Sequence, residues 1–255
     1  MKILKRFPFL PVFGLFLVMG FFLGTRVGLS RGTANSANDS LVTAPAPIAT
    51  TAEFATPQPA AANGQRNVLV IGVDTMQPEN ARLESIWLVL YFPGYSEFNV
   101  IPLFPAALSG GQSQDDALSG AFNLRADHLP STEFLKAIQD LDLWWNKVLV
   151  IDEAGLARMI DQLGGVVLDG DTFNGANAVA NLSNPWDAPK QALQGQVSLA
   201  KALCSQSPGV FSPETIQAMG SLIGTHIYTS GDMRSTLADW QNLNEPVSCQ
   251  FPTLE

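Results

Sequence analysis

The residue types best suited to chemistry stand at the edges of two apolar runs. Asp74 directly follows the run NVLVIGV (67–73), and Arg82 and Glu84 stand just before the run SIWLVLYF (85–92). Carboxylate oxygens bind hard divalent cations, and a guanidinium group binds phosphate through paired hydrogen bonds. Each residue also has an ordinary explanation, because an aspartate at a strand end often caps a turn and an exposed Arg–Glu pair adds little stability. The pattern alone leaves both interpretations open.

Several common catalytic and metal-binding patterns are absent from the sequence. There is no Gly-X-Ser-X-Gly element and no Walker-type phosphate loop. His128 and His226 are isolated, which disfavours a histidine-based metal site, and two cysteines are too few for a four-ligand zinc site. Asp152 stands before a predicted helix and Asp161 lies within it, and we expect both to have structural roles, as caps or as solubilising residues.

The N-terminal residues predict a membrane anchor. Residues 8–24 are uncharged, and a helix of about 17–20 residues can cross the hydrocarbon core of a bilayer. Basic residues in segment 1–7 favour a cytoplasmic tip there, followed by a transmembrane helix at 8–25. A cleaved signal peptide is the alternative, with residues 34–37 (Ala-Asn-Ser-Ala) as the cleavage region. Both interpretations place the bulk of the chain outside the cytoplasm, and the first makes it a single-pass protein of the cell membrane.

The rest of the chain divides into a tether and a globular domain. Residues 26–65 are rich in Ala, Thr, Ser, Pro and Asn and predict a loose linker before a domain at 66–255. The chain is 46% hydrophobic and 15% charged, which excludes wholesale disorder. Its net charge is −9, and the residues after position 31 carry −14, with 9 positive against 23 negative charges. Such an acidic surface repels phosphate backbones, so we expect no nucleic-acid partner.

The predicted extracytoplasmic location makes a disulfide between the two cysteines plausible. Cys204 and Cys249 lie in an extracytoplasmic domain, where disulfides form and persist. A disulfide between them would fasten the C-terminal tail, although their spacing does not prove it.

Hydrophobic periodicity predicts alternating strands and helices in the domain. Strands are predicted at 67–73, 85–92, 98–104 and 147–151, the second and third forming an antiparallel hairpin, and 166–168 returns to the sheet. Residues 105–130 are rich in Gly, Ser and Ala and predict a long loop. Helices are predicted over 131–143, over a stretch that includes Leu156 and Leu163, and near 192–206, 213–224 and 233–243. Helices on both sides of a sheet make an α/β or α+β sandwich.

Two segments resemble signatures of the LytR-CpsA-Psr family of bacterial cell-envelope proteins. Residues 67–93 are similar to the family's strand ending in Gly-X-Asp, its Arg-Ser-Asp-Thr element and its next strand. Residues 147–169 (KVLVIDEAGLARMIDQLGGVVLD) are similar to its strand-Asp-X-X-Gly-helix-Leu-Gly-Gly-Val unit. The resemblance covers about residues 66–245 and implies an α/β fold, an α-β-α sandwich with a central mixed sheet.

The resemblance also implies a function. Members of the family are extracytoplasmic phosphotransferases that move glycopolymers from a polyprenyl-pyrophosphate carrier onto peptidoglycan with Mg²⁺. It implies that Asp74 and Glu84 are metal ligands and that Arg82 acts on phosphate, where charge neutralisation carries most of the catalysis. Arg82 matches the Arg of the Arg-Ser-Asp-Thr element, while Glu84 and Ser85 replace its Asp and Thr.

The sequence departs from the family at the other arginines. Where the family has Ser-Ile-Pro-Arg-Asp after the second strand, the chain has Pro105 and Ala106 at the Arg and Asp positions. The helix that carries two arginines in the family has none here, and Lys190 or Lys201 would have to replace part of the phosphate clamp.

Two hypotheses follow, and a third is disfavoured. The first is a phosphotransferase with Asp74, Glu84 and Arg82 at its site. The second is a family member without catalysis that binds a polyprenyl chain or glycan, or serves as an envelope scaffold. A role as a transcriptional attenuator, sometimes attached to this family, is disfavoured by the membrane anchor and the acidic domain.

Overall fold

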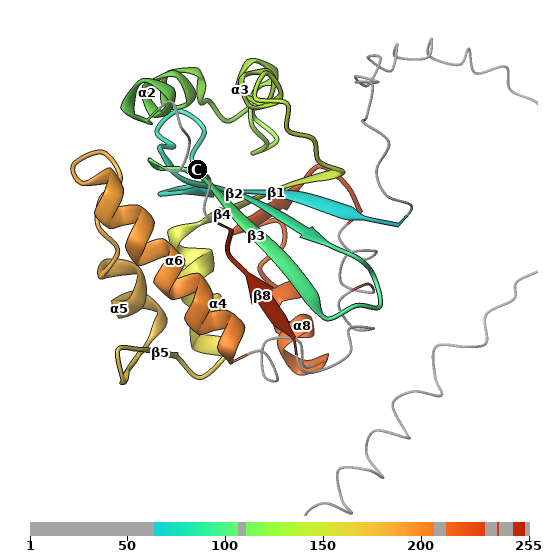
Figure 1. The fold of residues 1–255 in the computed structure, drawn as a ribbon, viewed down its shortest axis with the longest axis vertical. Helices are drawn as coiled ribbons and strands as arrows, with labels where there is room; N and C mark the ends of the chain where they lie inside the picture. The colour runs from blue at the N-terminus through green and yellow to red at the C-terminus, as the bar shows by residue number, and fades with distance from the viewer. Residues whose placement is uncertain (1–63, 107–110, 207–212, 233–238, 240–246, 253–255) are drawn as a thin grey trace, which may run out of the picture. The chain divides into compact units, whose positions relative to one another are not determined.

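The computed structural model describes residues 64–106, 111–206, 213–232, 239 and 247–252 (Figure 1). The predicted transmembrane helix at 8–25, almost all of the linker and nearly all of the helix predicted at 233–243 lie outside these residues. Among the helices in the described ranges, none has the length and apolar composition needed to span a bilayer.

A six-stranded mixed sheet forms the centre of the domain. Its strand order is β7-β4-β1-β2-β3-β8. The strands are β1 (Arg66–Val73), β2 (Leu83–Tyr91), β3 (Glu97–Phe104), β4 (Lys147–Asp152), β7 (Ile227–Thr229) and β8 (Ser248–Gln250). β2 pairs antiparallel with β1 and β3, which confirms the predicted hairpin, whereas β4 pairs parallel with β1 and β8 parallel with β3.

Helices cover both faces of this sheet, as Figure 1 shows. On one side lie α2 (Gly111–Ala121) and α3 (Thr132–Gln139), and on the other lie α4 (Glu153–Gln162), α5 (Gly175–Ala180) and α6 (Pro189–Ser205). A further helix, α8 (Pro213–Gly220), contacts α4. The prediction of a mixed α/β fold with a central mixed sheet is therefore confirmed.

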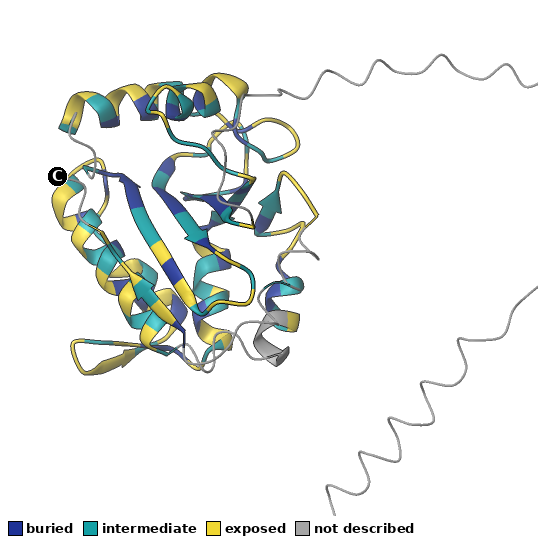
Figure 2. Ribbon diagram, turned by 45° about the vertical axis from the view of Figure 1, so that its right-hand side comes forward, coloured by how far each residue is buried: buried dark blue, intermediate teal, exposed yellow. Residues whose placement is uncertain are grey.

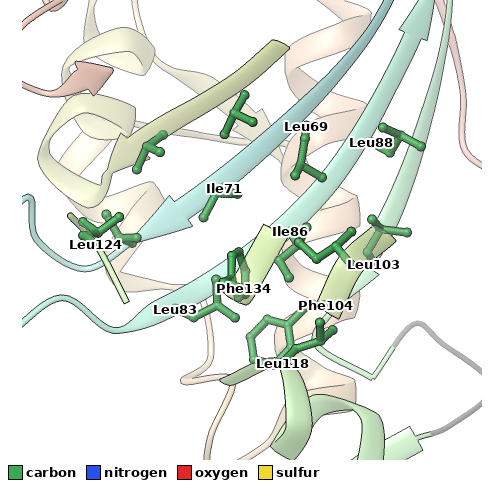
Figure 3. Packing of buried hydrophobic residues seen from close by; sticks show 14 of the residues in the cluster. Leu69, Ile71, Leu83, Ile86, Leu88, Leu103, Phe104, Leu118, Leu124 and Phe134 are labelled. Carbon is green, nitrogen blue, oxygen red and sulfur yellow. The ribbon is translucent and has the colours of Figure 1, made fainter. Parts of the chain in front are cut away.

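The principal hydrophobic core lies between the sheet and helices α2 and α3. Leu69 and Ile71 alternate along β1 and are fully buried, because successive strand residues point to opposite faces. Figure 3 shows them packed with Phe134 of α3 and Leu118 of α2. Burying a side chain of this size contributes about 1.5–3 kcal/mol. Burial of these side chains fixes the register of the strands, and the register in turn decides which side chains lie on the opposite face of the sheet.

The predicted loop at 105–130 is wrong, because α2 occupies residues 111–121. Its sequence, GQSQDDALSGA, has low hydrophobicity and only Leu118 and Asp115 are buried, so the apolar periodicity that indicates a helix is missing. Asp115 instead fixes the helix to the end of β3 by accepting a hydrogen bond from the Ala106 backbone N–H at 2.6 Å.

The placement of residues 166–168 in the main sheet is also wrong. β5 (Val166–Leu168) pairs antiparallel with β6 (Asp171–Phe173) in a separate two-stranded sheet. The two strands are joined by Asp169 and Gly170, both with positive φ (53° and 92°). Asp-Gly is a strong two-residue hairpin signal, and it turns the chain before it can return to the main sheet.

Candidate functional site

The strand register brings the candidate residues to one edge of the sheet. β1 and β4 are parallel and Val73 lies opposite Asp152, so the residues that follow both strands emerge together. β2 runs the other way, with Val73 opposite Leu83, so the start of β2 lies at the same edge. Asp74, Arg82 and Glu84 therefore meet, and Glu153 at the start of α4 joins them.

Asp74 binds Arg82 through both carboxylate oxygens. Oδ1 accepts a hydrogen bond from the Arg82 backbone N–H at 2.7 Å, and Oδ2 accepts one from Nε at 3.0 Å. The Arg82 side chain is 63% exposed, while that of Asp74 is 20% exposed. The aspartate thus fixes the arginine at its backbone and at Nε, while the side chain stays largely exposed, as binding of an anion requires.

Glu84 and Glu153 add negative charge to this edge. Burial, followed by the charges of Glu153 and Asp74, raises the pKa of Glu84 from 4.5 to about 7, against the opposing effect of Arg82. Burial and then Asp74 also raise the pKa of Glu153. Three carboxylates therefore face one arginine, and the edge carries an excess of negative charge.

These polar residues close one end of an apolar pocket of about 590 Å³. The pocket lies on the face of the sheet opposite the principal core, where its floor is made of Val70, Trp87, Val89, Val100, Leu149 and Ile151. Most of these residues are only half-buried, and residues of α4, α5 and α6 line the pocket with them. Figure 2 draws half-buried stretches of the ribbon in teal. The volume falls within the range of about 300–1,000 Å³ that small-molecule ligand sites occupy.

Gln196 of α6 connects the pocket wall to the acidic edge. Its Nε2 donates a hydrogen bond to the backbone carbonyl of Glu84 at 2.9 Å, whereas its Oε1 is buried and has no partner in the described part of the chain. Gln196 lines the same pocket as Asp74, Arg82 and Glu84.

The carboxylates of Asp74 and Glu84 fit Mg²⁺ only if water or ligand oxygens complete the coordination shell of the ion. Within the ranges that the structure describes, no three His, Cys, Asp or Glu side chains are grouped to hold a metal by themselves. Mg²⁺ is usually held by one or two carboxylates together with water and phosphate oxygens. Asp74 and Glu84 line this pocket, and a cation there would offset the charges of Glu153 and Asp74, which add to burial in raising the pKa of Glu84. The residues present therefore fit such a cation, with Glu153 beside them.

The proposed replacement of the phosphate clamp by lysines is not supported. Neither Lys190 nor Lys201 lines the pocket, and Arg82 is the one basic residue that lines it among those described. Lys201 is exposed and lies over the ring of Phe251, 5.7 Å from its centroid. Lys190, at the start of α6, is exposed as well.

The other residues singled out from the sequence have structural partners. Asp152 caps α4 by accepting from the Gly155 N–H at 2.7 Å, and Asp161 accepts from the Gly175 N–H at 2.7 Å. His226 is not isolated, because its Nδ1 lies 3.0 Å from both carboxylate oxygens of Asp152. Cys204 and Cys249 are joined in a disulfide, with their Cα atoms 6.2 Å apart.

Two residues of the site were not predicted from the sequence. Glu153 directly follows β4, and a carboxylate beyond a strand parallel to β1 was the available signal. Gln196 carries no such signal, since only the packing of α6 brings it to Glu84.

Comparison with known proteins identifies the fold. Neither a protein-family model nor a curated protein matches the sequence. Among solved structures, protein gbs0355 from Streptococcus agalactiae is 15% identical with a TM-score of 0.54, covering 74% of this chain and 77% of that one. TagV from B. subtilis is 13% identical with a TM-score of 0.50, covering 75% and 85%. The predicted LytR-CpsA-Psr resemblance is thus confirmed at the level of the fold.

Proposed function

We propose that this chain is an envelope protein, anchored through residues 8–25, that binds a polyprenyl-pyrophosphate-linked glycan outside the cytoplasm. The observation that carries the proposal is one apolar pocket whose polar end holds Asp74, Arg82 and Glu84. A polyprenyl chain gains roughly 25 cal/mol for each Å² of its surface removed from water. The apolar floor of the pocket buries the polyprenyl chain, and the polar end of the pocket binds the pyrophosphate head group.

The charge balance makes this binding dependent on a divalent cation. Arg82 alone cannot offset Asp74, Glu84 and Glu153, so a pyrophosphate would meet net repulsion. Mg²⁺ supplies neutralisation of the phosphate charge when it is bound, with Asp74 and Glu84 as its protein ligands. Arg82 then contributes its free guanidinium nitrogens to the phosphate oxygens.

Transfer of the glycan to peptidoglycan is the second candidate function. It is favoured by the Asp74–Arg82 pair, which keeps an arginine in a fixed position at the pocket. Pro105 and Ala106 weigh against it, because neither can bind phosphate by its side chain where the family has Arg and Asp. Removing one strong charge contact costs a transferase roughly a hundredfold in rate or more, so binding without catalysis is the function that the site supports best.

The test is binding of a polyprenyl pyrophosphate to the full-length chain in detergent, with and without Mg²⁺. We expect binding that requires Mg²⁺ and is lost in Asp74→Ala. The matched control is Asp127→Ala, because Asp127 likewise binds an arginine (Arg125) and a backbone N–H but lies outside the pocket.

Absence of binding to the wild-type chain under both conditions would reject the proposal. Equal binding by wild type and Asp74→Ala would remove Asp74 from the site. A transfer assay with peptidoglycan as acceptor then separates the two candidate functions.

A further inference from the structure

Exposed aromatic side chains gather at the turn between β2 and β3. Among the described residues, two of the large hydrophobic side chains that are exposed, Phe92 (39%) and Tyr95 (69%), stand in this one turn. The others are scattered over β5, the loop before α6 and the pocket lining: Val167, Trp186 and Ile223. Single exposed apolar side chains are ordinary on a protein surface, whereas a group of them indicates a contact surface.

The turn holds the two aromatic rings in place. The Tyr95 backbone N–H donates a hydrogen bond to the Phe92 carbonyl at 3.0 Å, and Gly94 between them has the positive φ (83°) that such a turn requires. The two rings meet edge to face, with centroids 6.2 Å apart. Below them, Tyr91 and Phe98 are buried and fix the turn to the sheet. Phe92 and Tyr95 thus form a rigid aromatic tip.

The chain enters the domain at the same end of the sheet. Arg66, the first residue of β1, lies opposite Tyr91, and Phe92 follows Tyr91 directly. The predicted membrane anchor at 8–25 is therefore joined to the domain, through the linker, beside the aromatic tip. A flexible linker of about 40 residues spans about 35 Å. It keeps the domain near the bilayer and leaves the orientation of the domain to the domain's own surface.

Two more aromatic residues stand at this end. β4 runs parallel to β1 with Lys147 opposite Val68, so Trp144 and Trp145, which precede β4, lie near the start of β1. The Trp144 carbonyl accepts a hydrogen bond from Asn67 Nδ2 at 3.2 Å, and both tryptophans are half-buried. Tryptophan and tyrosine are enriched where a bilayer meets water, because their rings are amphipathic. The residue types at this end are therefore those of a membrane interface.

Charge does not supply the attraction to the bilayer. Segment 92–96 is uncharged, and the residues after position 31 carry −14. Anionic head groups attract basic segments and repel acidic ones. Contact with lipid at this end therefore depends on removal of the aromatic rings from water.

We propose that Phe92 and Tyr95 insert into the head-group region of the bilayer that holds the anchor. This inference rests on the proposed function, since it requires the anchor at 8–25. Asp74 follows the other end of β1, so the polar end of the pocket faces away from the bilayer. The polyprenyl chain then has to rise along the face of the sheet for its head group to reach Asp74 and Arg82.

Three tyrosines make the contact measurable in the full-length chain. The sequence contains only Tyr91, Tyr95 and Tyr228, and each gives one fluorine NMR signal when the chain is made with 3-fluorotyrosine. The chain is placed in phosphatidylcholine nanodiscs with and without a lipid that carries a nitroxide on its head group. A nitroxide broadens the signals of nearby fluorine atoms. We expect the Tyr95 signal to be lost and the signal of Tyr228, which lies further along the strands opposite Val150, to be retained.

One variant and its matched control test the role of the rings. Phe92→Ser removes half of the aromatic tip and should restore the Tyr95 signal in the presence of the nitroxide lipid. Val167→Ser changes a similarly exposed apolar residue in β5 and should leave the Tyr95 signal lost. The comparison of Tyr95 with Tyr228 in the wild-type chain requires neither variant, so it decides the question even if Phe92→Ser fails to fold.

The outcomes distinguish this inference from the proposed function. Retention of the Tyr95 signal in a chain that copurifies with the nanodiscs would overturn the aromatic tip and leave the proposed function intact. Loss of the Tyr228 signal, with or without that of Tyr95, would show contact through another surface and also overturn the tip. Equal loss of the Tyr95 signal in wild type and Phe92→Ser would assign the proximity to the linker alone, with the same consequence. A chain that does not copurify with nanodiscs would overturn the anchoring in the proposed function and the tip with it.

Discussion

Asp74 holds Arg82 at two points, the backbone N–H and the guanidinium Nε. The first bond closes the chain between β1 and β2, and a backbone bond from the Asp74 N–H to the Arg82 carbonyl at 3.2 Å reinforces it. The second bond orients the side chain. Changing Arg82 therefore removes only the side-chain bond, whereas changing Asp74 removes both, so the two variants separate a loss of ligand binding from a loss of stability.

The first prediction concerns this separation. Arg82→Ala keeps the backbone bond and removes a largely exposed ion pair, so the free energy of unfolding should change little. Asp74→Ala leaves the Arg82 N–H without its acceptor and should cost about 1–2 kcal/mol. Urea denaturation measures both, and an equal loss of stability in the two variants would contradict the assignment.

The second prediction follows from the raised pKa of Glu84. The folded state holds its proton up to about pH 7, whereas the ordinary value is 4.5. The folded state binds more protons between these values, so the free energy of unfolding should fall as the pH rises from about 4.5 to about 7. Because Glu84 is only half-buried, solvent screening limits the loss to about 1–2 kcal/mol.

Glu84→Gln should remove this loss. With a chelator present, the variant should be more stable than wild type at pH 8 and equal to it near pH 4.5. Urea denaturation at both values tests this, with the exposed residue change Glu79→Gln as the control. A stability difference that is the same at both pH values would show that Glu84 does not titrate as described.

The third prediction concerns the contact between α4 and α5. A Cβ at Gly175 would collide with the backbone carbonyl of Ala157, which belongs to a helix and cannot move aside. Gly175→Ala should therefore destabilise the fold by about 1–3 kcal/mol. Gly120 in α2 has nothing within 4 Å of the same position, so Gly120→Ala should be neutral or stabilising by up to about 1 kcal/mol. Thermal unfolding compares the two, and similar effects would contradict the packing argument.

The strands of the sheet could be predicted from sequence because their apolar runs are long and uninterrupted. β1 and β4 lie in the middle of a sheet that helices cover on both faces, so the central residues of both strands form uninterrupted apolar runs. α2 could not be predicted, since its one apolar anchor, Leu118, leaves no periodicity, and its contact with β3 runs through the buried carboxylate of Asp115.

The site was less predictable than the fold, because it depends on register. Asp74 was singled out because it ends an apolar run, Arg82 because it matches the Arg of a family motif, and Glu84 because it replaces the Asp of that motif. Glu153 became a neighbour only through the parallel pairing of β1 and β4, which no local pattern specifies. Gln196 required the position of α6 above β2 as well.

The last prediction concerns the disulfide that holds the C-terminal strand. β8 contributes three residues at the edge of the sheet, pairing with β3 from Ser248 to Gln250, a length with little stability of its own. Cys249 links it to Cys204 of α6 across a separation of 45 residues, and closing a loop of that length stabilises a fold by up to about 4 kcal/mol. Both cysteines pack against a cluster that includes Val68, Tyr91 and Phe98.

Replacing both cysteines by serine should therefore lower the free energy of unfolding by about 2–4 kcal/mol and free β8 from the sheet edge. Mass spectrometry without reductant should find the Cys204 and Cys249 peptides linked in the wild-type chain. Hydrogen exchange should become faster at 248–250 in the double variant while β1 and β2 stay protected, because their core lies on the other side of the sheet. Unchanged exchange at 248–250 would mean that strand pairing with β3 alone holds the tail in place.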